Sequence, residues 1–218
     1  MPDRADSAKA DVPAILEVLE RLYPDARPEL NFTNPYETLV ATMLSAQCTD
    51  VQVNKVTPEV FRAFPDVGAM AETTPETLYP MVQSCGFKSK ATNIVMAARD
   101  IVERHGGRIP DTLEALTSLR GVGRKTANVV LANAFGIPAM AVDTHVFRVS
   151  NRLGIASASS PEQAEIQLME AIPREKWHLA HLQLILHGRR ICKARNPLCP
   201  SCALLPLCAH PVNPPAGF

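Results

Sequence analysis

Four of the six cysteines in this chain lie in one short segment near its C-terminal end, with the spacing C-x6-C-x2-C-x5-C. Four thiolates in a single loop can surround a metal centre without ligands from the rest of the fold. An iron-sulfur cluster and a zinc ion both accept such ligands, although zinc sites usually contain two closely spaced pairs and this loop contains one. The centre is either a structural clamp or an electron carrier. The cysteines are Cys192, Cys199, Cys202 and Cys208.

A second candidate site is a glycine hairpin followed by two basic residues. Gly121, Val122 and Gly123 separate two segments whose apolar residues recur at helical spacing. Two glycines permit positive φ angles and expose backbone N–H groups. Arg124 and Lys125 follow where the second helix is expected to begin. Exposed amides at a helix N-terminus form an anion site, so the segment predicts a grip on nucleic-acid phosphates that does not depend on base sequence.

Lys125 has chemistry of its own. The positive end of the helix dipole and partial burial both disfavour an ammonium at this position. A neutral lysine amine is a nucleophile that can form a Schiff base. The alternative is a lysine that only contacts phosphate, and its position alone does not separate the two interpretations.

Asp143 is the candidate carboxylate. It follows the apolar stretch 137–142 and precedes a segment of helical spacing, where aspartate is a favoured N-cap. Capping alone would explain the residue. A capping carboxylate next to an apolar stretch would also be fixed and partly desolvated. It could then interact electrostatically with a lysine or a cationic substrate. His145 is interpreted as a hydrogen-bonded structural histidine.

Helices must position all of these residues, because strand patterns are almost absent. Apolar residues recur at helical spacing along the chain and prolines interrupt them, which predicts an all-α fold of roughly ten short helices. Three Thr/Ser-Pro-Glu triplets are typical of helix starts with proline in the first turn. They begin at Thr57, Thr74 and Ser160.

The charge pattern argues against a uniformly basic nucleic-acid binder, because the formal net charge is zero. Basic residues nevertheless concentrate in 86–125 and in 187–195. The polar N-terminus has no apolar signal core, and no apolar run of membrane length follows it. These features predict a soluble cytoplasmic protein without membrane contact, in which clustered cysteines bind metal rather than form disulfides.

Together these motifs resemble endonuclease III, in the helix-hairpin-helix DNA glycosylase superfamily. The resemblance extends over roughly Ile15 to Cys208. The cysteine loop carries it together with Leu119–Asn128, Val142–Val146, Leu44–Gln47, Asp50 and Leu184–Gly188.

The resemblance implies a base excision repair enzyme that removes oxidised pyrimidines from duplex DNA and then cleaves the abasic strand by β-elimination. Lys125 matches the family's Schiff-base nucleophile and Asp143 its catalytic aspartate. The four cysteines match the ligands of a [4Fe-4S] cluster, which we interpret as structural. Gln47 matches a residue that fills the gap left by the extruded base.

The implied fold has two helical domains. Residues 29–137 form a six-helix domain with the hairpin, and residues 1–28 and 138–218 form the cluster domain. The protein is expected to act as a monomer on double-stranded DNA with damaged bases or abasic sites, associated with the nucleoid. The expected DNA contacts are Gln47, Phe87, Lys88, Gly121, Val122, Gly123, Arg124, Thr144, His145, Arg189, Arg190 and Lys193.

The sequence departs from the family pattern in two places. Arg120 occupies the position before the hairpin where the family commonly has proline. The loop Gly86–Lys90, where the family inserts a wedge into the duplex, is one residue shorter. Phe87 is the expected wedge residue in this chain.

Three alternatives remain. A pyrimidine-dimer glycosylase/lyase of the same superfamily would use the same lysine and aspartate. An adenine-mismatch glycosylase is disfavoured, because those enzymes lack a lysine at this position and usually add a C-terminal domain. A non-catalytic DNA-binding or electron-transfer module would explain the hairpin and the cysteines, but not Lys125 together with Asp143.

Overall fold

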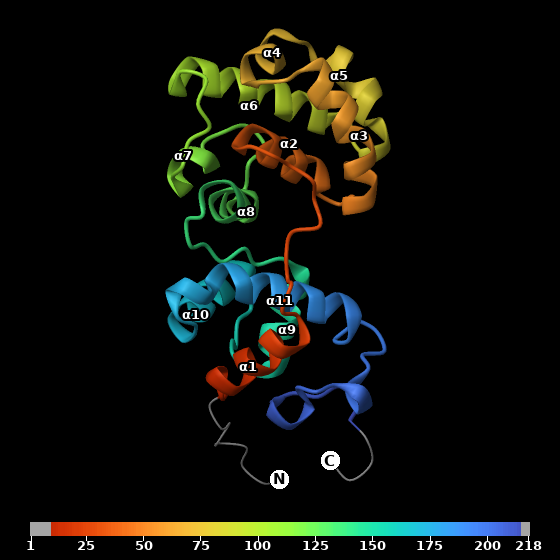
Figure 1. Ribbon diagram of the computed structural model, residues 1–218, viewed down its shortest axis with the longest axis vertical. Coiled ribbons are helices and arrows are strands. Elements are labelled where there is room, and N and C mark those ends of the chain that lie inside the picture. The colour runs from red at the N-terminus through yellow and green to blue at the C-terminus, as the bar shows by residue number, and fades with distance from the viewer. Residues whose placement is uncertain (1–9, 215–218) are drawn as a thin grey trace. The chain divides into compact units, whose positions relative to one another are not determined.

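The computed structural model describes residues 10–214, and within that range the chain is helical without any strand (Figure 1). The prediction of an all-α fold is therefore confirmed. The chain divides into two compact units: Pro28–Ala139 forms one, and the described residues up to Arg27 and from Met140 onward form the other. No helix within 10–214 combines the length and the apolar character needed to cross a membrane.

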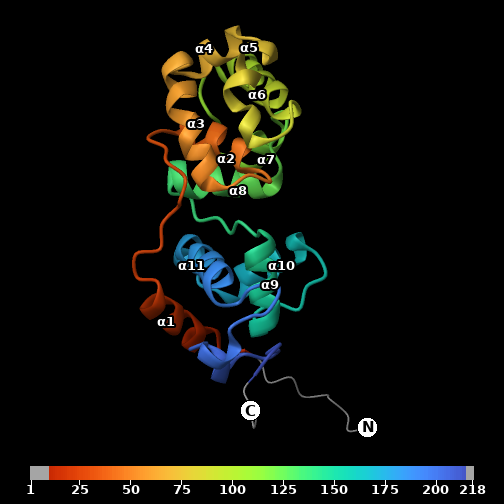
Figure 2. The ribbon, with the colours of Figure 1, turned by 90° about the vertical axis from the view of Figure 1, so that its right-hand side faces the viewer.

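The unit Pro28–Ala139 is described in full and holds seven α-helices, where the resemblance implies six. They are α2 (Pro35–Ser45), α3 (Asp50–Ala63), α4 (Val67–Glu72), α5 (Pro75–Val82), α6 (Ser89–His105), α7 (Leu113–Thr117) and α8 (Arg124–Phe135), with the 3-10 turn η1 (Gln83–Cys85). The long helix α6 packs along α4 and α5, and α2 packs against α8 (Figure 2). Leu44 of α2, Ile94 of α6 and Val122 of the glycine hairpin lie in one buried apolar core.

The unit made of the two chain ends carries the cysteine loop. Its elements are α1 (Val12–Leu22), α9 (Thr144–Leu153), α10 (Pro161–Ala171), η2 (Arg174–Lys176), α11 (Trp177–Arg190), η3 (Cys199–Ser201) and η4 (Leu205–Leu207). Helix α11 packs against α9 and α1, and α10 packs against α9. Leu204, between two of the cysteines, is fully buried in the same core as Ile15 and Leu184. The loop is therefore anchored to the helices by its own apolar residue.

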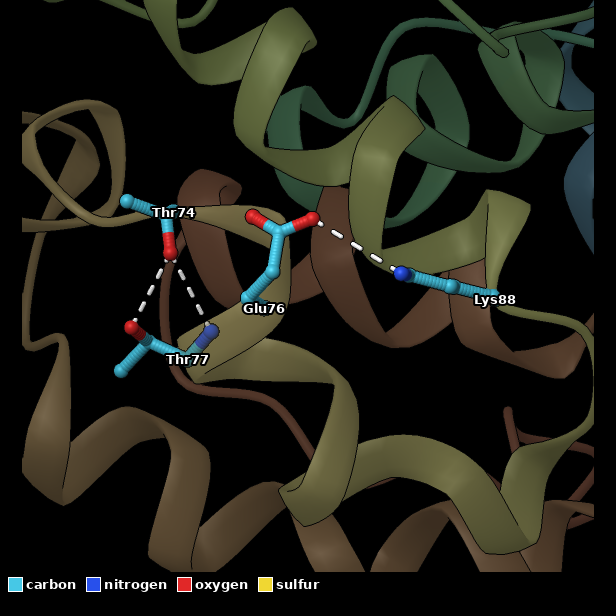
Figure 3. A network of polar contacts seen from close by, with 4 residues as sticks. All are labelled: Thr74, Glu76, Thr77 and Lys88. Atoms are coloured by element: carbon cyan, nitrogen blue, oxygen red, sulfur yellow. Dashed lines mark hydrogen bonds and ion pairs between the residues drawn. The ribbon is translucent and has the colours of Figure 1, made fainter.

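Two of the three predicted helix starts are confirmed. The hydroxyl oxygen of Thr74 accepts a hydrogen bond from the Thr77 N–H at 3.2 Å, with Pro75 in the first turn of α5 (Figure 3). The Ser160 hydroxyl accepts from the Gln163 N–H at 3.3 Å in the same way at α10.

The prediction of a helix start at Thr57 is wrong, because α3 begins at Asp50 and Pro58 lies inside it. A proline in a helix interior removes one backbone hydrogen bond and costs about 3 kcal/mol. Val53, Thr57 and Val60 are nevertheless buried at the spacing of one continuous helix face. Burial of this face offsets the cost of the proline, so the helix continues through it.

Candidate active site

The glycine hairpin joins α7 to α8 and is held at its centre by Val122, which is buried and donates its N–H to the Leu119 carbonyl at 3.2 Å. Gly121 has a φ of +74°, and a Cβ atom there would lie 2.6 Å from the side chain of Asn93 on α6. Glycine is therefore required at position 121 for both conformation and space. Gly123, for which the sequence also suggested a positive φ, has a φ of −89° and is the N-cap of α8.

Lys125 is the second residue of α8 and its side chain is exposed. The expected partial burial is not observed, because α8 buries the opposite face that carries Ala127 and Val130. Gly123 has no side chain to cap the helix, which leaves the N-terminal amides of α8 to other acceptors. Arg124 is also exposed, so two basic side chains and the positive end of a helix dipole coincide.

Asp143 is half-buried and caps α9, as its residue type suggests. One carboxylate oxygen, Oδ1, accepts hydrogen bonds from the N–H groups of His145 and Val146, both at 2.8 Å. These two bonds fix the orientation of the carboxylate relative to α9. Lys125 belongs to the unit Pro28–Ala139 and Asp143 to the unit of the chain ends.

His145 and Arg148 form a tight cluster beside this cap. The Arg148 guanidinium lies 3.1 Å from His145 Nδ1 and donates to the carbonyls of Gly188 (3.0 Å), Cys192 (3.0 Å) and Thr144 (3.3 Å). Burial lowers the pKa of the His145 ring, against the opposing charge of the Asp143 carboxylate. His145 is therefore a neutral hydrogen-bonded residue near pH 7, and Thr144 is exposed beside it.

Gln47 and Phe87 lie in two loops of the same unit. Gln47 follows the end of α2 in a left-handed conformation, with a φ of +54°, and is exposed. Phe87 is 71% exposed, so its ring is not part of the core of this unit. Next to it, Lys88 is exposed and forms an ion pair with Glu76 of α5 at 3.7 Å (Figure 3).

The four predicted metal-ligating cysteines line one cavity in the unit of the chain ends. Within residues 10–214, no group of three or more histidine, cysteine or acidic side chains is placed to hold a metal ion. The donor set itself, four thiols around one cavity, fits an iron-sulfur cluster. Burial raises the pKa values of the Cys202 and Cys208 thiols.

The cavity walls are supplied by α9 and α11. The guanidinium of Arg152 lies 3.4 Å from Cys192 Sγ and donates to the Lys193 carbonyl at 2.8 Å. The ring of His187 bridges Tyr23 Oη, at 3.1 Å, and Cys202 Sγ, at 3.6 Å. Burial lowers the pKa of His187 to about 4, so its ring is neutral near pH 7. The loop is thus held by side chains from α9, α11 and the segment after α1.

The predicted basic contacts near the loop are solvent-exposed. Arg189 and Arg190 end α11, and Lys193 follows the first cysteine. The Arg190 guanidinium lies over the Tyr23 ring, 5.5 Å from its centroid. A cation–π contact of this kind orients the arginine while leaving its edge available to a phosphate.

Sequence reasoning did not identify the roles of Arg148 and Arg152. They are four residues apart on α9, which places them on one helix face. That spacing was the available signal, but it does not reveal that the face meets the end of α11 and the cysteine loop. The two guanidiniums connect the helix that Asp143 caps to the segment around Cys192.

The family model of the HhH-GPD superfamily of base excision DNA repair proteins matches residues 40–174. This range contains Gln47, the glycine hairpin, Lys125 and Asp143, and it ends before the cysteine loop.

Relatives extend the similarity over almost the whole chain. Endonuclease III of Synechocystis sp. is 48% identical over 204 residues, 93% of each chain. Endonuclease III of Escherichia coli K12 is 46% identical over 199 residues, 89% of this chain and 94% of the relative. A solved structure of a trapped endonuclease III–DNA covalent intermediate, an estranged-adenine complex, has 44% identity and a TM-score of 0.87, covering 90% of this chain and 93% of that one.

Proposed function

Since this chain belongs to the HhH-GPD superfamily of base excision DNA repair proteins, and within it to the endonuclease III family, we propose that it is a DNA glycosylase and abasic-site lyase. Its substrates are duplex DNAs with an oxidised pyrimidine or an abasic site, on which it acts as a monomer. The observation that best supports this function is the exposed position of Lys125 at the start of α8, directly after the glycine hairpin. A covalent intermediate requires an enzyme nucleophile, and a 44% identical endonuclease III has been captured in one with DNA.

Binding begins at the DNA backbone. The hairpin amides around Gly121 and Gly123, with the Arg124 side chain, hold a phosphate near the damaged nucleotide. The exposed Arg189, Arg190 and Lys193 add contacts that depend on charge rather than sequence. The damaged nucleotide is then extruded from the stack, which costs a few kcal/mol and less for a poorly paired base. Gln47 and Phe87 occupy the space that it leaves.

The amine of Lys125 attacks C1′ of the extruded nucleotide. The C1′–N bond breaks, the base leaves with the bonding electrons and takes up a proton, and the amine loses a proton. Opening of the sugar ring gives an imine between Lys125 and C1′. Loss of a C2′ proton from this imine breaks the C3′–O bond and expels the 3′ phosphate, and hydrolysis of the product imine frees Lys125. One residue therefore accounts for both base removal and strand cleavage.

Asp143 acts as an electrostatic partner in this scheme. Positive charge develops on the sugar as the C1′–N bond lengthens, and a fixed carboxylate stabilises it. Because both capping bonds use Oδ1, we assign this role to Oδ2, the oxygen left to face substrate.

We further propose that Cys192, Cys199, Cys202 and Cys208 hold a [4Fe-4S] cluster. When bound, it crosslinks the loop and fixes the exposed basic residues beside it. Purified protein is expected to be brown, with a broad visible absorption band and about four iron atoms per chain. Cys202→Ala should lose the band and melt roughly 10 °C lower, since losing a metal centre costs several kcal/mol and 1 kcal/mol shifts Tm by about 2–4 °C. Stoichiometric zinc without iron would contradict this assignment.

The activity is tested with a panel of duplexes that each contain one defined lesion, incubated with sodium borohydride. A duplex with an oxidised pyrimidine is expected to yield a covalent protein–DNA adduct, because borohydride reduces the imine to a stable amine. An adduct on a pyrimidine-dimer duplex but not on oxidised pyrimidines would favour the dimer-specific alternative. The absence of any adduct, even on abasic DNA, would leave only a non-catalytic module.

A further inference from the structure

Lys90, at the start of α6, connects two segments that are distant in sequence. Its ammonium donates hydrogen bonds to the carbonyl oxygens of Leu44, at 2.8 Å, and Cys85, at 2.5 Å. The side chain is half-buried, in contrast to the exposed Lys88 two residues earlier. Hydrogen bonds from a charged donor are roughly twice as strong as neutral ones, so this lysine is a substantial link between the two segments.

Each of these carbonyls stands at the base of one of the two loops assigned to gap filling. Leu44 lies in the last turn of α2, three residues before Gln47. Cys85 ends η1, two residues before Phe87. Between them, Gly86 has a φ of +116°, and a Cβ atom there would lie 3.6 Å from Lys90 Nζ. The lysine therefore packs against the turn that presents Phe87.

A further contact joins the helix after the Gln47 loop to the turn before Phe87. Gln52 Nε2, near the start of α3, donates to Ser84 Oγ at 2.8 Å. Burial, and then a hydrogen bond with the Cys48 thiol, raise the pKa of the Cys85 thiol to about 11. The segments that flank the loops of Gln47 and Phe87 are thus connected by Lys90 and by the Gln52–Ser84 hydrogen bond, and Lys90 provides the ammonium in these contacts.

We propose that Lys90 is a positioning residue that holds Gln47 and Phe87 as one rigid wedge for extruding the damaged nucleotide. The inference rests on the proposed glycosylase function and assigns a residue to its extrusion step. Two side chains must enter the duplex together. If their loops are already fixed in the free enzyme, little conformational entropy is lost on binding, and more of the binding energy remains for extrusion. Lys90 touches neither the base nor the sugar in this role, and acts only through the two carbonyls.

The test compares two substrates in single-turnover reactions at saturating enzyme. With Lys90→Met, base release from a paired oxidised pyrimidine is expected to slow by about 10- to 100-fold, as two charge-assisted hydrogen bonds are lost. Borohydride trapping on a preformed abasic duplex should change by less than about threefold, because no base remains to be unstacked. A 2-aminopurine placed next to the lesion should show slower or smaller unstacking by fluorescence.

Matched variants separate this role from simple phosphate binding. Lys88→Met removes an exposed charge of the same loop (Figure 3), and should raise the enzyme concentration needed for half-saturation. Lys90→Met should instead lower the rate at saturation. Gln52→Ala removes the hydrogen bond to Ser84 and should also lower the rate at saturation, by a smaller factor than Lys90→Met. In the double variant, the loss of activation free energy should be less than the sum of the two single losses.

Equal slowing of both substrates by Lys90→Met, or no slowing of either, would overturn the proposal. If Lys90→Met melts far below the wild-type protein, the same comparison is made with Gln52→Ala and Ser84→Ala. Both substitutions remove the exposed Gln52–Ser84 hydrogen bond and leave the buried core unchanged. Wild-type trapping on abasic DNA is measured in the same series. Its failure would reject the proposed function itself, whereas its success with unchanged variants would reject only the role of Lys90.

Discussion

Lys125→Gln is expected to abolish the borohydride adduct and to lower base release by roughly ten thousand-fold or more, the scale seen when a catalytic nucleophile is removed. Glutamine keeps the length and polarity of the side chain but cannot form an imine. Because Lys125 is exposed on α8, its replacement should change the free energy of unfolding by no more than about 0.5 kcal/mol. Affinity for abasic DNA should fall only by the loss of one positive charge. Trapping, single-turnover release and a binding titration measure these three quantities.

A second lysine variant controls for charge. Lys88→Gln removes a positive charge from the wedge loop and should weaken DNA binding, but should still yield the adduct once enzyme saturates the DNA. Peptide mapping of the wild-type adduct should place the modification on Lys125. An adduct that persists in Lys125→Gln, or maps to another side chain, would move the chemistry away from the start of α8.

The local part of the site could be predicted from the sequence, because short-range rules govern it. A glycine hairpin followed by basic residues predicted a helix start, and α8 begins at Arg124. An aspartate before a helical segment predicted an N-cap, and Asp143 caps α9 with two hydrogen bonds. These features depend on residues within about four positions of one another, where capping and turn preferences decide the conformation.

The remainder depends on tertiary packing, which periodicity does not encode. Lys90 donates a hydrogen bond to the Leu44 carbonyl, 46 residues away in the sequence, and Arg148 donates one to the Cys192 carbonyl, 44 residues away. Which face of α8 is buried also decides that Lys125 is exposed. Pro58 illustrates the same limit, since its neighbours resemble a helix start while the burial of Val53 and Val60 keeps α3 continuous.

Asp143→Asn is expected to slow base release by about 100- to 1000-fold, the usual effect of removing one electrostatic contribution to a transition state. Asparagine is as good an N-cap as aspartate, so its amide oxygen can accept the same two bonds from His145 and Val146. Stability should therefore stay close to wild type while the negative charge is lost. Trapping on preformed abasic DNA should be affected less, because the glycosidic bond is already broken there. Single-turnover release and thermal melting measure the two effects.

Asp143→Ala completes the comparison, because it removes both the charge and the cap. Loss of an N-cap costs about 1 kcal/mol, or roughly 2–4 °C in Tm for a chain of this size. If the carboxylate acts on the sugar, both variants should release base equally slowly while only the alanine variant melts earlier. If Asp143 serves only as a cap, the asparagine variant should be fully active and the alanine variant impaired in proportion to its lost stability. The charge and the cap, which coincide in one side chain, are separated by this pair of substitutions.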